Sequence, residues 1–228
     1  MPPHRPPTRS AAHARTHALT RVRERRQHLA AEAARVMVES GIRDFQLAKR
    51  KAAQRLGIVE DAALPDNREI EQALREYQRL FLGERQQQAL RRRRDAALPA
   101  LEFFAPFQPR LAGPVWDGTA DAHSPVLLHL HSDDPDAVSC WLSEHAIPAR
   151  PCQQRLRLDR EREGEFPAWR FVADGLEFDL CVLPLDCLRQ APLSAIDGRP
   201  MRRGSARQLR ELLLAEDIAL HEASRHGR

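Results

Sequence analysis

Apolar side chains recur at helical spacing in the first part of the chain. Between residues 22 and 40 they fall three or four positions apart, as on one face of an amphipathic helix, and Gly41 follows where that helix would end. A second set begins after Asp44, whose carboxylate can cap a helix, and stops at Gly57. The pattern therefore predicts a helical hairpin.

A third helical pattern, longer than the other two, starts near residue 68. Glycine lowers helix stability, so we expect a bend at Gly83 before the pattern continues to Leu98. We expect the helix to end there, because the ring of Pro99 would clash with the preceding helical turn.

The stretch from residue 99 to 114 breaks the helical pattern with four prolines and three phenylalanines. Exposed aromatic clusters are unfavourable, so we expect the phenylalanines to pack between two halves of the chain. The first residues are rich in Pro, Arg, His and Ser without a period that could bury a face. The predicted parts are a disordered basic arm (1–20), a helical domain (21–108), an α/β domain (109–220) and a tail (221–228).

In the second half, short apolar runs alternate with turns. Val126–His131 and Leu176–Leu183 have the composition of strands, and Asp174-Gly175 predicts a tight hairpin turn. Further predicted elements are a helix from Pro135 to about His145, strands at 155–158 and 169–173, a short helical segment at 185–189, and a last helix from about Ala206 that Ser205 and Gln208 cap. We therefore predict an α+β protein, with a helical domain followed by a small mixed-sheet α/β domain.

Composition narrows the class of protein. The 228 residues are enough for one large domain or two small ones. The net charge of +4 is modest, and almost all of the basic residues are arginines. The four cysteines contain no Cys-x-x-Cys pair, which argues against a zinc ribbon or a disulfide framework and favours reduced thiols in the cytoplasm. No window offers the roughly 20 apolar residues that cross a bilayer, so we expect no membrane partner.

Two basic stretches are candidates for nucleic-acid binding. The helical hairpin at residues 30–57, with small residues and Gly57 on its second helix, resembles the helix-turn-helix of tetracycline-repressor regulators. That resemblance places Lys49, Arg50 and Lys51 near DNA phosphates or the major groove. The densest basic run is Arg91-Arg92-Arg93-Arg94, which could bind RNA or phosphate. The alternative is an exposed helix end that has no ligand.

The α/β half carries a second resemblance. Gly118-Thr119 precedes the first predicted strand, Asp179 lies on a late strand, and the segment 197–209 leads into the last helix. Over residues 112 to 215 this order resembles the nucleotidyltransferase superfold of DNA polymerase beta and the small bacterial nucleotidyltransferases. The resemblance implies that Gly118, Thr119 and Ser124 bind the nucleotide.

In that family, two carboxylates at alternate strand positions and a third on a neighbouring strand hold two divalent cations. The resemblance places Pro125 and Leu127 at the first two positions, and Asp179, or Glu177 on the same face, at the third. Neutral Pro and Leu cannot hold Mg²⁺. We therefore expect impaired catalysis, with Mg²⁺ as a cofactor only if the site is functional.

A different metal site is also conceivable on the first predicted strand. His129 and His131 share one strand face, and a His-x-His pair at this spacing can chelate zinc together with a carboxylate such as Asp179. The alternative is that both histidines are structural. No phosphate-binding Gly-x-x-x-x-Gly-Lys loop and no Gly-x-Ser-x-Gly elbow is present.

The sequence thus predicts a nucleotidyltransferase-like protein of impaired catalysis that binds a nucleotide, a nucleic acid or a protein partner. One alternative is a DNA- or RNA-binding regulator that uses the arginine-rich helical half. Another is a structural interaction protein without a small-molecule site.

Overall fold

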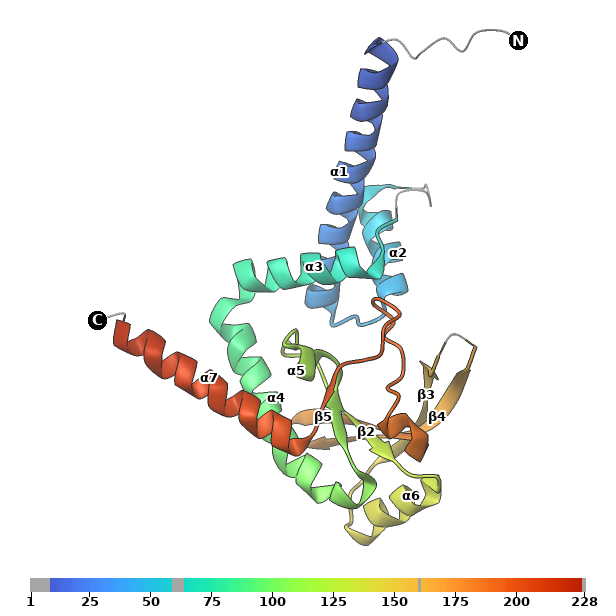
Figure 1. Cartoon of the computed structure of the whole chain (residues 1–228), viewed down its shortest axis with the longest axis vertical. Helices are drawn as coiled ribbons and strands as arrows, with labels where there is room; N and C mark the ends of the chain where they lie inside the picture. The colour runs from blue at the N-terminus through green and yellow to red at the C-terminus, as the bar shows by residue number, and fades with distance from the viewer. Residues whose placement is uncertain (1–8, 59–63, 160, 227–228) are drawn as a thin grey trace. The chain divides into compact units, whose positions relative to one another are not determined.

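The computed structural model describes residues 9–58, 64–159 and 161–226, and the chain forms two compact units, Met1–Phe81 and Leu82–Arg228 (Figure 1). The division falls within the third helical stretch and not at residue 108, where we expected it from the sequence. The reason is that the helix from residue 83 onward packs its apolar side chains on the sheet that follows it.

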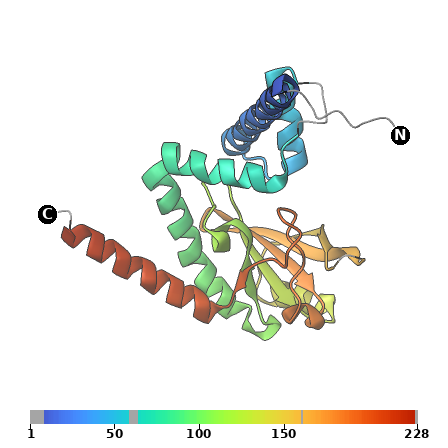
Figure 2. The same cartoon turned by 45° about the horizontal axis from the view of Figure 1, so that its top comes forward.

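The first unit is built from α1 (Arg9–Ser40), α2 (Phe45–Leu56) and α3 (Asn67–Tyr77), and α1 contacts both of the others (Figure 2). The predicted hairpin is confirmed. The Asp44 carboxylate caps α2 by accepting hydrogen bonds from two backbone N–H groups, and Gly57 ends α2 in the left-handed conformation. The buried side chains are mostly small: Leu29, Ala30, Ala33, Met37, Ala48, Ala52 and Ile70.

Helix α1 begins well before the predicted start. Residues 9–20 are helical, so the disordered arm expected over 1–20 is wrong for them, while residues 1–8 lie outside the described part of the chain. This stretch is rich in Ala and Arg, which favour helix without any apolar stripe. A search for amphipathic spacing alone therefore misses it.

The long third helical stretch is interrupted at Gly83, which has a positive φ, but it does not end where we predicted. One turn of π-helix (Gln78–Leu82) separates α3 from α4 (Gly83–Phe103), and α4 continues through Pro99. A proline inside a helix costs about 3 kcal/mol. Beyond it, Leu101 and Phe104 are both 1% exposed, and burying each contributes roughly 1.5–3 kcal/mol, which offsets that cost.

The second unit contains a six-stranded mixed sheet in the order β3-β4-β5-β2-β1-β6. Its strands are β1 (Arg110–Ala112), β2 (Val126–His131), β3 (Arg150–Arg157), β4 (Glu163–Ala173), β5 (Leu176–Leu183) and β6 (Arg203–Gly204). Strands β2 and β5 are parallel, and every other neighbouring pair is antiparallel. The predicted class, helices followed by a mixed sheet, is confirmed.

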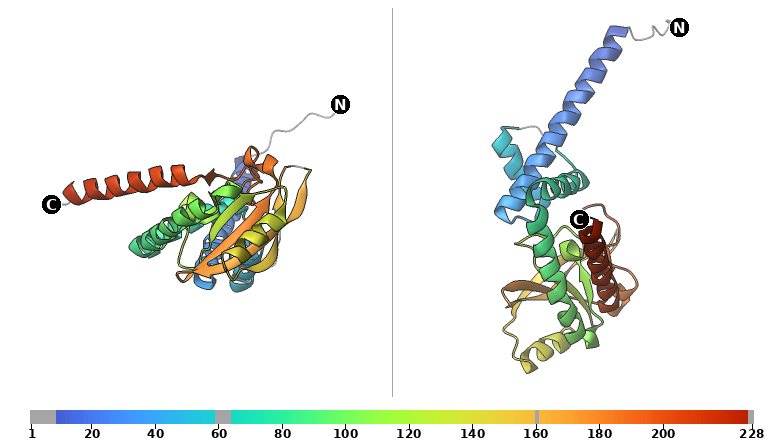
Figure 3. Two further views of the ribbon diagram at one scale, coloured as in Figure 1. Left: turned by 90° about the horizontal axis from the view of Figure 1, so that it is seen from below. Right: turned by 90° about the vertical axis from the view of Figure 1, so that its left-hand side faces the viewer.

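The helices of this unit after α4 are α5 (Gly113–Asp117), α6 (Pro135–Glu144) and α7 (Ala206–His226), with a 3-10 turn, η4 (Leu185–Leu188). Helix α7 lies against α4 and then extends beyond the sheet (Figure 3). It reaches residue 226, so the tail expected from residue 221 is helical over that length. Asp174 and Gly175 both have positive φ, as the predicted tight turn requires.

The two faces of the sheet differ. On the first face, Val126, Leu128 and Leu130 of β2 belong to the main core, together with residues of α4, α6 and α7. On the second face, alternate residues of β2 and β5 point the other way, and a smaller apolar cluster of Leu158, Cys181, Leu183 and Cys187 covers one end. The predicted site residues on β2 and β5 belong to this second face.

Within the described ranges, no helix is both long enough and apolar enough to cross a membrane.

Candidate functional site

The positions that the nucleotidyltransferase resemblance singles out lie side by side on the second face. In the parallel pair of β2 and β5, Leu127 is the register partner of Asp179. Val126 pairs with Phe178, so Pro125, just before β2, comes next to Glu177 in the same register. Glu177 is exposed and Pro125 is buried. Adjacent parallel strands thus bring together the three positions at which the family holds its cations.

Asp179 already has a cationic partner. Nε of Arg170, its cross-strand neighbour on β4, donates to the Asp179 carboxylate at 2.7 Å. The Asp179 side chain is 22% exposed and that of Arg170 is 59% exposed. The hydrogen bond to Asp179, followed by its negative charge, raises the pKa of Arg170. The guanidinium of Arg170 therefore neutralises Asp179, the half-buried carboxylate among these positions.

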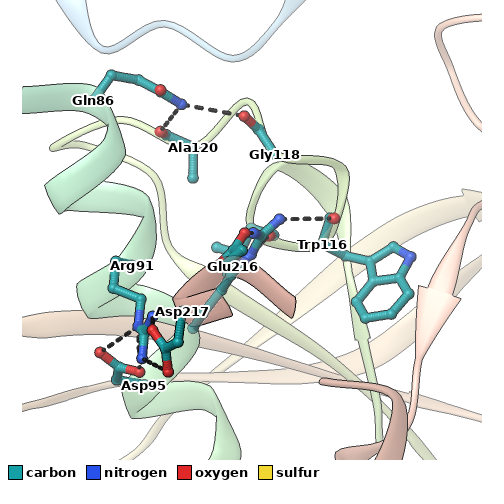
Figure 4. A network of polar contacts seen from close by, with 10 residues as sticks. Gln86, Arg91, Asp95, Trp116, Gly118, Ala120, Glu216 and Asp217 are labelled. Atoms are coloured by element: carbon teal, nitrogen blue, oxygen red, sulfur yellow. Dashed lines mark hydrogen bonds and ion pairs between the residues drawn. The ribbon is translucent and has the colours of Figure 1, made fainter. Parts of the chain in front are cut away.

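The turn at Gly118-Thr119 does not leave its backbone amides free. The N–H groups of Gly118, Thr119 and Ala120 all donate to the carbonyl oxygen of Pro114, at 2.9–3.1 Å. The Gln86 side chain donates to the carbonyls of Gly118 and Ala120 at 3.1 and 3.0 Å, which fixes the turn from α4 (Figure 4). In this conformation these amides are not free to cradle a phosphate, which is the contact that we expected of Gly118 and Thr119 from the sequence.

Ser124 is also held within its own loop. Its hydroxyl donates to the Asp121 carboxylate at 2.9 Å and accepts from the Asp121 N–H at 3.0 Å. Its carbonyl accepts from Nε of Arg93 at 2.6 Å. The structure therefore gives Ser124 a role in shaping the loop before β2.

Two arginines of the run 91–94 are buried. Arg93 and Arg94 are 5% and 4% exposed, which corrects the expectation that they lie open to nucleic acid. Arg93 also donates to the carbonyl of Ala122 at 2.6 Å. Arg94 donates to the carbonyl of Val115 at 3.0 Å and pairs with Glu216 of α7. Burial lowers the pKa of Arg94, and the charge of Glu216 partly counters this effect.

The other two arginines of the run also bind within the unit. Arg91 hydrogen-bonds Asp95 on its own helix and Asp217 on α7 (Figure 4). Nη2 of Arg92 donates to the carbonyl of Asp174, in the β4–β5 turn, at 2.7 Å. Consecutive helix residues point in different directions, so each of the four arginines contacts a different set of partners.

The three basic residues predicted on α2 to bind nucleic acid differ in their exposure to solvent. Lys49 is 7% exposed, which is a correction to its predicted position at a nucleic-acid surface. Burial lowers the pKa of Lys49, while the charges of Asp66 and Glu69 raise it. Arg50 and Lys51 are exposed.

The histidines of β2 are buried and are not arranged as metal ligands. His129 is 0% and His131 2% exposed, and no cluster of three metal-ligating side chains occurs in the described part of the chain. Nδ1 of His131 is 2.9 Å from the carbonyl oxygen of Gln108, and its Nε2 is 3.2 Å from Nη1 of Arg203. The carbonyl requires a proton on Nδ1, and the guanidinium requires a lone pair on Nε2. His131 is therefore neutral. The carboxylate that we expected to join the two histidines, Asp179, is instead the register partner of Leu127.

Both histidines are held in the neutral form by their surroundings. Burial, followed by the positive charge of Arg203, lowers the pKa of His129 to about 3. Burial also lowers the pKa of His131 to about 4; the Gln108 hydrogen bond opposes the shift, and the charges of Arg203 and Arg110 add to it. Within residues 9–58, 64–159 and 161–226, neither ring nitrogen of His129 has a hydrogen-bond partner.

Arg110 and Arg203 were not recognised from the sequence. Arg110 of β1 is the register partner of His129, and Arg203 of β6 pairs with Ala112, so both lie on the second face. They are 93 positions apart in the chain, and the intervening sequence gives no signal that they meet.

Comparisons with protein-family models, with curated proteins and with solved structures found no match to this chain.

Proposed function

We propose that residues 82–228 form a nucleotidyltransferase-like domain that has lost two-metal catalysis and binds a phosphate-bearing ligand, a nucleotide or a nucleic acid, on the second face of its sheet. The observation that carries this proposal is the register of β2 and β5, which places Leu127 beside Asp179. A different register, or strands in different sheets, would have separated the positions that the resemblance requires.

The loss of catalysis follows from charge. Two-metal transfer needs several carboxylates to compensate two divalent cations, because Mg²⁺ gives up its water reluctantly. Pro125 and Leu127 supply none, and Arg170 neutralises Asp179. In the described structure, the cationic side chain of Arg170 lies against Asp179, one of the three positions at which the family holds its metal ions.

The expectation of a bound phosphate group rests on the cationic side chains of the second face, Arg110, Arg170 and Arg203, since guanidinium groups match phosphate geometry. The Gly118-Thr119 amides are not part of the proposed contact, because they are already hydrogen-bonded. The cytoplasm remains the expected compartment, and the four cysteines are free thiols.

The test is a paired measurement on the full-length protein. Equilibrium titration with nucleoside triphosphates and with a short oligonucleotide should show binding, while incubation with labelled nucleoside triphosphate, Mg²⁺ and an acceptor should show no transfer. Absence of binding to every ligand would contradict the proposal. So would transfer that disappears in the Asp179→Asn variant, because this would mean that the site is still catalytic.

A further inference from the structure

Two guanidinium groups gather on the second face without a carboxylate to neutralise them. Arg110 and Arg203 are half-buried, and neither forms an ion pair with any residue that the structure describes. They are close enough to repel: burial first, and then the charge of Arg110, lowers the pKa of Arg203. Such a pair contrasts with Arg94 and Arg170, each of which contacts a carboxylate.

The groups that do contact this pair are neutral. Nη2 of Arg203 donates to the carbonyl of Cys187 at 2.7 Å, and its Nη1 is hydrogen-bonded to the neutral His131. Nη1 of Arg110 donates to the carbonyl of Pro109 at 2.9 Å. These contacts orient both guanidinium groups but supply no negative charge.

A buried polar side chain without a partner stands in the same place. His129 is 0% exposed and is the cross-strand neighbour of Arg110, and neither of its ring nitrogens is hydrogen-bonded to a residue that the structure describes. Leaving a buried polar group without a hydrogen bond is unfavourable. Buried unpaired groups are rare, and one beside two uncompensated cations indicates an anion that supplies the missing acceptor.

The backbone that leads into β1 is strained at the same point. Gln108 has φ 44, a left-handed conformation that non-glycine residues seldom adopt, and its carbonyl oxygen is the acceptor for His131. Strain of this kind is unfavourable and tends to persist at binding sites. Here it orients the carbonyl that fixes the protonation of His131.

From these four observations we propose that Arg110 and Arg203, with His129 and His131 behind them, form a binding site for a phosphate group. Each guanidinium can donate two N–H groups to a phosphate in a bidentate contact. The shared chemistry fits inorganic phosphate, pyrophosphate and the terminal phosphates of a nucleotide. The inference deepens the proposed function, on which it rests for the nature of the larger ligand.

The test uses the full-length protein and inorganic pyrophosphate, titrated by calorimetry at low ionic strength. The wild type should bind, and Arg110→Gln should weaken binding at least tenfold. Arg150→Gln is the matched control, because Arg150 is an exposed arginine on the same face, in register with Arg170, and should leave the affinity within twofold. No binding by the wild type, or equal losses in the two variants, would overturn the proposal.

A variant with the same net charge distinguishes binding at this site from non-specific electrostatic attraction of pyrophosphate to the protein surface. His129→Leu keeps the net charge and removes the two unpartnered nitrogens, and its affinity for pyrophosphate should fall severalfold. Thermal unfolding checks that each variant is folded before the titration. An affinity equal to that of the wild type would contradict the place of His129 in the site.

Two further ligands distinguish this inference from the proposed function. If pyrophosphate binding depends on Arg110 and a nucleoside triphosphate binds no more tightly than pyrophosphate, the phosphate site stands and nucleotide binding fails. If a nucleoside triphosphate binds equally well to wild type and Arg110→Gln, the proposed function stands and the site at Arg110 and Arg203 is wrong. Tighter binding of the triphosphate that also requires Arg110 supports both.

Discussion

The run Arg91–Arg94 and the pair Arg110 and Arg203 differ in a way that the sequence conceals. The run is the densest basic stretch of the chain, yet its guanidinium groups bind carbonyls and carboxylates of the same unit. The pair is dispersed in sequence, yet it gathers beside neutral histidines without a carboxylate among the described residues. The density of basic residues along the sequence therefore does not show which charges stay uncompensated in the folded structure. The uncompensated charges are the ones that remain able to attract an anion.

The largest expected effect concerns Arg94, one of the two buried members of the run. Arg94→Met should lower the free energy of unfolding by about 3–5 kcal/mol, because it leaves Glu216 and the Val115 carbonyl without their partner. Urea unfolding followed by tryptophan fluorescence measures this directly. Arg92→Met, at an exposed position, is the control and should cost less than about 1 kcal/mol. A loss below that value for Arg94→Met would mean that the run is not structural.

Acid should destabilise the unit through the histidines beside the pair. Their folded pKa values, about 3 for His129 and about 4 for His131, lie below the unfolded value near 6.5. The unfolded chain therefore binds more protons as pH falls from 6.5 to 4. The contribution of the two neutral histidines to the free energy of unfolding is fully present above pH 6.5. It is lost as pH falls below 6.5, by up to about 1.4 kcal/mol per pH unit for each histidine.

Unfolding curves between pH 7 and 4.5, for wild type and His129→Leu, measure this dependence. The groups that act on His129 are Arg203 and His131, while Arg203 and Arg110 act on His131, and all of these groups remain in the variant. The variant should therefore lose about half of the slope. Parallel curves would contradict a neutral, buried His129.

A smaller loss of stability is expected at Gly204 of β6, which lies against the indole ring of Trp116. A Cβ on Gly204 would lie 2.1 Å from Cζ3 of Trp116, so Gly204→Ala should cost about 1–3 kcal/mol through overpacking. It should also weaken pyrophosphate binding, because β6 carries Arg203. Gly164→Ala is the control, since its Cβ would meet Phe166 at an ordinary 3.6 Å. Unchanged stability and pyrophosphate affinity in Gly204→Ala would mean that the position of β6 does not matter to the pair.

The smallest effect is expected at Arg91, a partly exposed member of the run. Arg91 pairs with Asp95 and Asp217 at the surface, and Arg91→Ala should cost less than about 1 kcal/mol. The loss should shrink further when urea unfolding is repeated in high salt, since salt screens exposed ion pairs. A large, salt-independent loss would place Arg91 with Arg94 as a core residue.

Much of the fold is readable from the sequence where local signals are strong. The strands β2 and β5, the Asp174-Gly175 turn and the capped helix α7 all follow from short patterns with a clear physical reason. Strand β1 and helix α5 were missed, because elements of three and five residues are too short to show a periodicity. The predicted strands at 155–158 and 169–173 were too short, because β3 and the first part of β4 expose charged residues.

The candidate site was only partly readable. The resemblance assigned Leu127 and Asp179 to one site, and the two positions are register partners on the second face. The sequence could not show that Arg170 pairs with Asp179, or that Pro114 accepts from the Gly118 and Thr119 amides, because both contacts depend on how distant elements pack. The same holds for Arg110 and Arg203, which meet only through the pairing of β1 with β6.

The most direct test of a nucleotidyltransferase-like face is to restore its missing carboxylates and measure Mn²⁺ binding by electron paramagnetic resonance. The variant is Pro125→Asp with Leu127→Asp. The half-exposed Arg170 side chain can turn away from Asp179 to admit the ion. The control, Leu214→Asp with Ile218→Asp, adds the same charge at two exposed positions of α7.

We predict that the restored face, unlike the wild type and the control, gains a Mn²⁺ site, and that a further Asp179→Asn change weakens it at least tenfold. A folded restored variant that binds no more Mn²⁺ than the control would contradict the assignment of residues 125, 127 and 179 to one cation-binding geometry.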